Sequence, residues 1–214
     1  MRLRNVTGSR DVIAADEYAI HDPYEQKALK GHWNGLFGRK APLKLELGSG
    51  KGRFITTLAQ RDTDIDFIAC EGAFNVYPRI LQKAAALELP NLRVLSEYVA
   101  DPTEFFADGE ISGIYLNFSD PWKKRTANRR LTYREKLEGY RRICKSGATL
   151  EFKTDNSELF EYSLGELSAC GLVPDIIETD LHASPLEIFN IHTEYEDKFT
   201  ERGEKIKYFR ISFT

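Results

Sequence analysis

The chain has 214 residues, of which 42% are hydrophobic and 29% are charged, and its formal net charge is -3. This length and balance suit a soluble α/β domain with a full core, and they exclude nucleic-acid binding through overall positive charge. No apolar run is long enough to cross a bilayer and the first residues lead into no secretory signal, so we expect a cytoplasmic protein without membrane contact.

Alternating strands and helices are predicted from residue 41 onward, after an N-terminal arm of residues 1–40. The apolar segments predict strands over 43–47, 66–71, 91–95, 113–118, 148–153, 172–180 and 206–213. Helices are predicted between them over 53–60, 76–87, 134–144 and 158–170. This order is typical of a mostly parallel sheet with helices on both faces. The last two strands lack a usual helix pattern between them, which favours an antiparallel last strand. We therefore expect a single α/β domain over 41–214.

The run from Leu45 to Gly52 predicts a cofactor site. It joins an apolar strand to a G-x-G-x-G turn formed by Gly48, Gly50 and Gly52, and a helix start follows. Such a strand, turn and helix make room for a nucleotide-like ligand. The spacing differs from the G-x-G-x-x-G of dinucleotide binders and, with Glu46 two residues earlier, is similar to motif I of class I S-adenosylmethionine (SAM) methyltransferases. An ordinary strand-to-helix turn is the alternative.

Further polar residues stand where strands are predicted to end. Glu71 closes the second strand, at the distance from the glycines expected of an acid that binds ribose hydroxyls. Residues 117–122 close the fourth strand and residues 153–156 close the fifth. Carboxyl ends of parallel strands meet at one edge of a sheet, so these residues are expected to share one cleft. Singly, each has a simpler role, such as Asp155 as a helix N-cap.

Cysteine and histidine indicate no further site. Cys70, Cys144 and Cys170 are widely spaced without a CxxC pair, and the four histidines form no close ligand pair in sequence. Neither a disulfide framework nor a metal site is therefore expected.

Four motifs carry a specific resemblance. They are NFSDPWKKR at 117–125, RRLT at 129–132, FKTDN at 152–156 and TEYE at 193–196. In this order they resemble the bacterial tRNA (guanine-N7)-methyltransferase family, and the likeness extends from about Trp33 to the C-terminus. It implies one Rossmann-like class I methyltransferase domain with a seven-stranded sheet, and SAM as the cofactor. It also implies tRNA as the partner, methylated at N7 of the variable-loop guanine by a monomer or homodimer.

Together with the glycine turn, the resemblance implies two sets of site residues. The cofactor set is Glu46, Gly48, Gly50, Gly52, Glu71, Glu97, Tyr98 and Asp120. The substrate set is Lys123, Lys124, Asp155, Thr193, Glu194, Tyr195 and Glu196. One residue fewer than usual follows Trp122, so either lysine can match the family's lysine, and spacing favours Lys124. Tyr98, beside Glu97, stands where the family tends to have an aspartate, so the adenine contact stays open.

Asp120 is the expected catalytic residue. Guanine N7 is a lone pair at neutral pH, so its methylation needs no general base. Asp120 is better suited to accept hydrogen bonds from guanine N1–H and N2–H2 and to support the charge that develops on the ring. A turn-forming aspartate before Pro121 is the alternative.

A basic run follows this predicted strand end and suggests contacts to tRNA phosphates. Arg125, Arg129 and Arg130 are its expected phosphate ligands, with a solvated face as the alternative. The acidic segment 193–196 cannot hold phosphate. It also fits a plain helix start, with Thr193 as cap and Glu196 completing a capping box.

Three other functions stay open. One is a SAM methyltransferase acting on another RNA, a protein or a small molecule; a target other than RNA would leave the basic run unexplained. A second is a nicotinamide-dependent oxidoreductase, which the glycine spacing and Glu46 disfavour. The third is a catalytically idle tRNA-binding relative, in which the altered loop after Trp122 has lost turnover.

Overall fold

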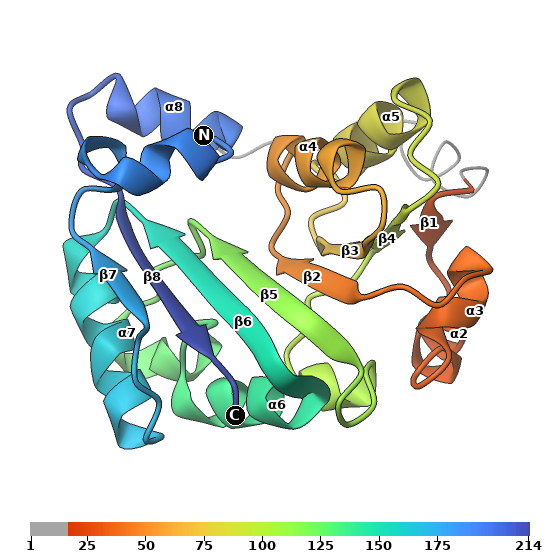
Figure 1. Ribbon diagram of the computed structural model, residues 1–214, viewed down its shortest axis with the longest axis horizontal. Helices are drawn as coiled ribbons and strands as arrows, with labels where there is room; N and C mark the ends of the chain where they lie inside the picture. The colour runs from red at the N-terminus through yellow and green to blue at the C-terminus, as the bar shows by residue number, and fades with distance from the viewer. Residues whose placement is uncertain (1–16) are drawn as a thin grey trace.

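A computed structural model describes residues 17–214 and contains one eight-stranded sheet (Figure 1). The strand order is β1-β4-β3-β2-β5-β6-β8-β7. All neighbours pair in parallel except β8, which is antiparallel to both β6 and β7. The strands are β1 (Ala19–Ile20), β2 (Leu43–Leu47), β3 (Asp66–Cys70), β4 (Leu92–Leu95), β5 (Ile111–Asn117), β6 (Cys144–Thr154), β7 (Ile176–Glu178) and β8 (Lys207–Ser212). The expected α/β class and antiparallel last strand are confirmed.

Helices cover both faces of the sheet, as expected. Two hydrophobic clusters separate the faces, because alternate strand residues point to opposite sides. One cluster packs α4 and α5 against the sheet, and the other packs α6 and α7 on the opposite side (Figure 1). The helices are α2 (Pro23–Ala28), α3 (Trp33–Phe37), α4 (Arg53–Arg61), α5 (Pro78–Ala86), α6 (Arg134–Ile143), α7 (Ser157–Ala169) and α8 (Glu194–Thr200). None of those within residues 17–214 has the length and apolar character of a membrane-spanning segment.

The sheet has one strand more than the seven expected. β1 is only two residues long, so it has no alternation that a sequence pattern could reveal; it pairs with Val94 and Leu95 of β4. Residues 1–16 of the expected N-terminal arm lie outside the described residues. The described part of the arm is attached to the domain at Trp33, which is fully buried. Its indole N–H donates to the Phe105 carbonyl at 3.0 Å.

The segment between the last two strands contains more helix than its pattern indicated. It forms two 3-10 turns, η3 (Leu181–Ala183) and η4 (Pro185–Phe189), before α8. Thr193 and Glu196 close the capping box at the start of α8, as its sequence allowed. Figure 1 shows α8 beyond the carboxyl ends of β5 and β6, next to the edge where the strand-end residues meet.

Candidate active site

A cleft of about 1190 Å³ opens at the carboxyl ends of β2, β3 and β5. Its lining includes most of the predicted cofactor residues: Gly48, Gly50, Glu71, Glu97, Tyr98 and Asp120. Trp122 and Arg129 line it as well. The parallel topology therefore gathers residues from four separate turns into one space, as ligand sites in such sheets generally require.

The glycine turn presents bare backbone to open space. Gly48 and Gly50 have φ angles of +80° and +56°, and a Cβ built at either would meet no atom within 4 Å. This left-handed conformation suits glycine and leaves room for a ligand. Gly52 also has a packing role, because a Cβ there would lie 2.9 Å from Ile80 Cγ2. Its lack of a side chain lets α4 pack against α5.

Glu71 ties the glycine turn to the turn that follows β3. Its Oε2 accepts from the Gly50 N–H and its Oε1 from the Ala73 N–H, both at 2.8 Å. Burial raises the pKa of Glu71, and the two backbone donors oppose that rise. Each oxygen keeps a second acceptor site, so the carboxylate can also accept from hydroxyl groups in the cleft.

Glu46 is buried behind the glycine turn with one oxygen unsatisfied. Its Oε1 accepts from Asn117 Nδ2 at 2.8 Å, and its Oε2 has no hydrogen-bond partner among the described residues. Burial raises the pKa of Glu46 to about 7, against the hydrogen bond from Asn117. A buried acceptor without a donor requires an explanation. A cationic ligand group such as the SAM ammonium would supply the missing partner, and the chemistry of these residues fits that cofactor.

This arrangement predicts a pH-dependent affinity for SAM. A carboxyl group with a pKa near 7 falls from about one half ionised at pH 7 to about one tenth at pH 6. Because the charged form attracts the ammonium, the Kd for SAM should rise about fivefold between pH 7 and pH 6. Isothermal titration at both pH values measures the change. Glu46→Gln should bind more weakly at both and lose the Glu46-dependent part of the trend; an unchanged trend in that variant would assign the effect to another group.

Asp120 follows an unusual backbone turn at the end of β5. Phe118 has a φ of +52°, a conformation that costs a bulky residue about 1–3 kcal/mol. Its N–H still donates to the Lys153 carbonyl at 2.8 Å, which is the last backbone contact to β6. The residues after Phe118 leave the sheet and line the cleft. Asp120 is exposed there. Burial raises the pKa of Glu71 and of Tyr98, and the nearby charge of Asp120 adds to both.

The loop after Asp120 separates exposed cations from a buried one. Lys123, Lys124, Arg125 and Arg129 are exposed around the 3-10 helix η2 (Lys124–Arg129), and the Arg129 guanidinium lies 4.9 Å from the Trp122 ring centroid. Arg130 is buried instead; its Nε donates to the Trp122 carbonyl at 2.8 Å and its guanidinium lies over the Tyr162 ring. It fastens the loop and leaves little surface for a phosphate.

Further along the basic run, arginines are paired with acids. Ion pairs join Arg134 to Glu166, Arg141 to Glu138 and Arg142 to Asp108. These partners offset the positive charge of the run on α6. The uncompensated positive surface is therefore narrower than the sequence indicated, and it lies beside the cleft.

The side chains of residues 194–196 have different surroundings. Glu196 is fully buried and pairs with Lys153 at 2.7 Å, and Glu194 pairs with Lys83. Tyr195 is 42% exposed, and its ring centroid lies 5.0 Å from that of Phe118. Burial is the main cause that raises the pKa of Tyr195 to about 12, and the adjacent Asp155 adds to the rise. Tyr195 and Asp155 are thus neighbours beside the Phe118 turn.

Two residues from the predicted strand ends have supporting roles that the sequence did not assign. Asn117 holds Glu46, and Lys153 is a buried lysine at the end of β6 that pairs with Glu196. The available signal is their place at predicted strand ends, and a lysine next to the buried Phe152 needs a partner if it is buried too.

Known methyltransferases resemble this chain in sequence and in fold. A family of putative methyltransferases matches residues 40–209. The chain is 48% identical to the tRNA (guanine-N(7)-)-methyltransferase of Geobacillus thermodenitrificans over 208 residues, covering 96% of this chain and 94% of that protein.

Solved structures extend the likeness in fold. The 16S rRNA methyltransferase KamB has a TM-score of 0.65 at 14% identity and covers 86% of this chain and 93% of its own. A geranyl diphosphate C-methyltransferase from Streptomyces coelicolor A3(2), in a complex that includes S-adenosyl-L-homocysteine, has a TM-score of 0.55 at 16% identity, covering 83% of this chain and 72% of its own. At these identities the likeness shows a shared fold alone.

Proposed function

The chain belongs to the tRNA (guanine-N(7)-)-methyltransferase family, and on that premise we propose that its target is the variable-loop guanine, oriented by Asp120. Its reaction is the transfer of a methyl group from SAM to N7 of a guanine in tRNA. We place this activity in the cytoplasm, where the partner is tRNA, and the enzyme acts as a monomer or homodimer.

The cofactor would be held between the glycine turn and the acids around it. SAM supplies a methyl group already activated by a sulfonium cation. Gly48 and Gly50 would let it approach the backbone, Glu46 would pair with its ammonium, and Glu71 would accept from its ribose hydroxyls. The exposed ring of Tyr98, which lines the same cleft, would cover its adenine.

Asp120 would act by orientation and charge. Its carboxylate would accept from guanine N1–H and N2–H2, which directs N7 toward the methyl group and supports the positive charge formed on the ring. No residue has to remove a proton, because N7 carries none. The backbone turn at Phe118 supports this role, since it directs the Asp120 segment into the same cleft as the glycine turn.

The tRNA would lie across the loop that follows. Lys123, Lys124, Arg125 and Arg129 would bind phosphates, and Arg130 would hold the loop in shape. On the other side of Asp120, Tyr195 and Asp155 would contact the target nucleotide; an exposed aromatic ring beside a carboxylate suits a base that is turned out of the helix. Thr193, Glu194 and Glu196 would position Tyr195 through the capping box and ion pairs.

The observation that carries the proposal is the single cleft shared by the glycine turn and Asp120, bordered by exposed cations. Its test is methyl transfer to an unmodified tRNA transcript, with the modified base located by chemical cleavage at 7-methylguanine. We expect methylation at the variable-loop guanine and none when that base is 7-deazaguanine, which lacks only the N7 acceptor. Methylation in another loop would overturn the assigned target, and binding without any transfer would indicate an idle relative.

A further inference from the structure

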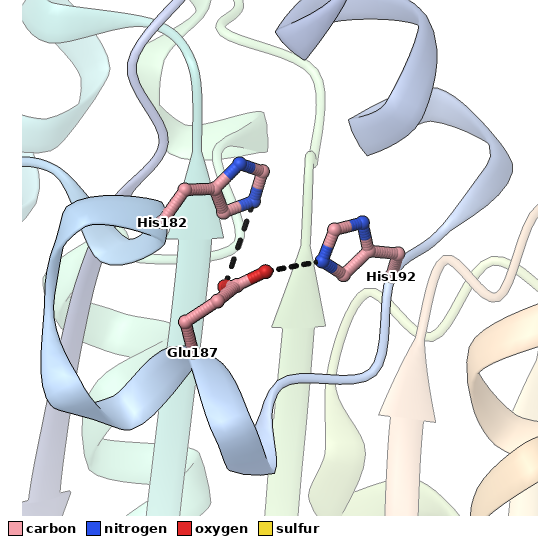
Figure 2. A group of neighbouring side chains, drawn as sticks. All are labelled: His182, Glu187 and His192. Carbon is pink, nitrogen blue, oxygen red and sulfur yellow. Dashed lines mark hydrogen bonds and ion pairs between the residues drawn. The ribbon is translucent and has the colours of Figure 1, made fainter.

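We propose that His182, Glu187 and His192 form a binding site for a divalent transition metal ion such as Zn²⁺. Their ligand atoms all lie within 4.8 Å of one another (Figure 2). The three residues come from the segment between β7 and α8, outside the methyl-transfer cleft, so this inference is independent of the proposed function. Two imidazoles and one carboxylate are a ligand set that Zn²⁺ commonly takes, with water in the remaining position.

The side chains converge from η3, from η4 and from the loop that precedes α8. Figure 2 shows the Glu187 carboxylate, from η4, facing one ring nitrogen of His182 and one of His192. Glu187 Oε1 lies 2.6 Å from His192 Nε2, and Glu187 Oε2 lies 3.9 Å from His182 Nε2. The three side chains are 17%, 30% and 34% exposed for His182, Glu187 and His192, so an ion can enter from solvent and still be partly shielded.

Both histidines have a partner for the ring nitrogen that faces away. His192 Nδ1 is 2.8 Å from Asp197 Oδ1, an arrangement that orients a metal-bound imidazole and increases its basicity. His182 Nδ1 is 3.4 Å from Thr200 Oγ1, whose hydroxyl donates to the Glu196 carbonyl. The Thr200 oxygen can therefore accept from His182 Nδ1–H, which leaves the Nε2 lone pair for an ion.

Two local changes accompany binding. The rings of His182 and His192 are stacked within 7° of parallel, so each has to turn to direct its Nε2 lone pair at a common ion. His182 Nε2 also has to lose the proton that faces Glu196 at 2.9 Å, so that the ring keeps a proton on Nδ1 only and presents the Nε2 lone pair to the ion. Glu196 keeps Lys153 and Asn190 as donors, each at 2.7 Å. The ion replaces the proton shared by His192 Nε2 and Glu187, and that proton is released to solvent.

Binding at this site would brace the segment that carries Tyr195. His192 directly precedes Thr193, the N-cap of α8, and the other two ligands belong to η3 and η4. An ion would therefore join both 3-10 turns to the start of α8. The site supplies no group to the cleft where the methyl group is transferred, so its ion would act through the conformation of this segment.

The test is isothermal titration of the chelator-treated full chain with ZnCl₂. We expect one ion per chain, and an affinity at least about 100-fold weaker in Glu187→Gln and in His192→Ala, because each removes a ligand. His32→Ala is the matched control, since His32 is an exposed histidine outside the cluster, and it should bind as the unchanged chain does. Zn²⁺ should also raise the Tm of the unchanged chain and of the control, but not of the two ligand variants.

Cobalt identifies the ligand type. Co²⁺ bound at this site should show visible absorption bands without a thiolate charge-transfer band. A thiolate band would move the ion to the partly exposed Cys170 and overturn the proposal. Equal affinity in all variants, or no uptake by the unchanged chain, would overturn it as well. Circular dichroism verifies folding, and Glu187→Gln carries the test if His192→Ala does not fold.

Discussion

Asp120→Asn is expected to lower the single-turnover rate of tRNA methylation at least tenfold, about 1.4 kcal/mol of activation free energy. Asparagine keeps the shape and one acceptor but lacks the charge that stabilises the alkylated ring. Affinity for SAM should stay close to that of the unchanged chain, because the carboxylates of Glu46 and Glu71 remain. The measurement is a single-turnover assay with saturating SAM and tRNA, paired with titration of SAM.

Asp101→Asn is the matched control, because Asp101 also lines the cleft and asparagine can still accept from the Thr103 N–H. This variant should react at full rate. With both substrates saturating, the unchanged chain should show no steep rise in rate between pH 6 and pH 8, since N7 has no proton to remove. A full-rate Asp120→Asn variant would remove Asp120 from the mechanism, and a steep rise would indicate a general base.

Lys153→Met is expected to lower the free energy of unfolding by about 3–5 kcal/mol. Lys153 and Glu196 form a buried ion pair at 2.7 Å, and the lysine also donates to Asn190 and to the Ile191 carbonyl. Methionine fills a similar volume but leaves the Glu196 carboxylate buried without its cation. Chemical denaturation followed by circular dichroism measures the loss.

Two further variants separate the ion pair from side-chain packing. Lys145→Met changes an exposed lysine on the same strand and should alter stability little. Adding Glu196→Gln to Lys153→Met should recover part of the loss, because a neutral amide is cheaper to bury unpaired than a carboxylate. A Lys153→Met variant as stable as the unchanged chain would mean that water already compensates these charges.

Sequence patterns predicted the central sheet because its strands are long enough to show their character. β2 alternates leucines with Lys44 and Glu46, β3 is apolar after Asp66, and the α4 sequence repeats its apolar residues at helical spacing. β1 was missed because two residues carry no period, and its pairing with β4 arises only from tertiary contact. α8 was foreseen only as an alternative, through the capping residues Thr193 and Glu196.

In the candidate site, too, residues in local motifs could be predicted and contacts between distant residues could not. Gly48, Gly50 and Asp120 are recognisable because a local motif marks each one. The partner of Glu46 is Asn117, 71 residues away, and no local spacing indicates that contact. The charge of Arg130 suggested a phosphate ligand. Its burial against Tyr162 depends on the folded chain and has no signal in the sequence. His182 and His192 likewise become neighbours only through the two turns between them.

The position of β8 has a consequence for the order of assembly. β8 lies between β6 and β7, although it follows both in the chain. During synthesis, β6 therefore exposes an unpaired edge while residues 155–206 emerge, and β7 has no strand to join until β8 arrives. An open edge of this kind invites pairing with other chains. The sheet of this enzyme therefore closes only when β8 inserts between β6 and β7, and the β6 edge stays open until then.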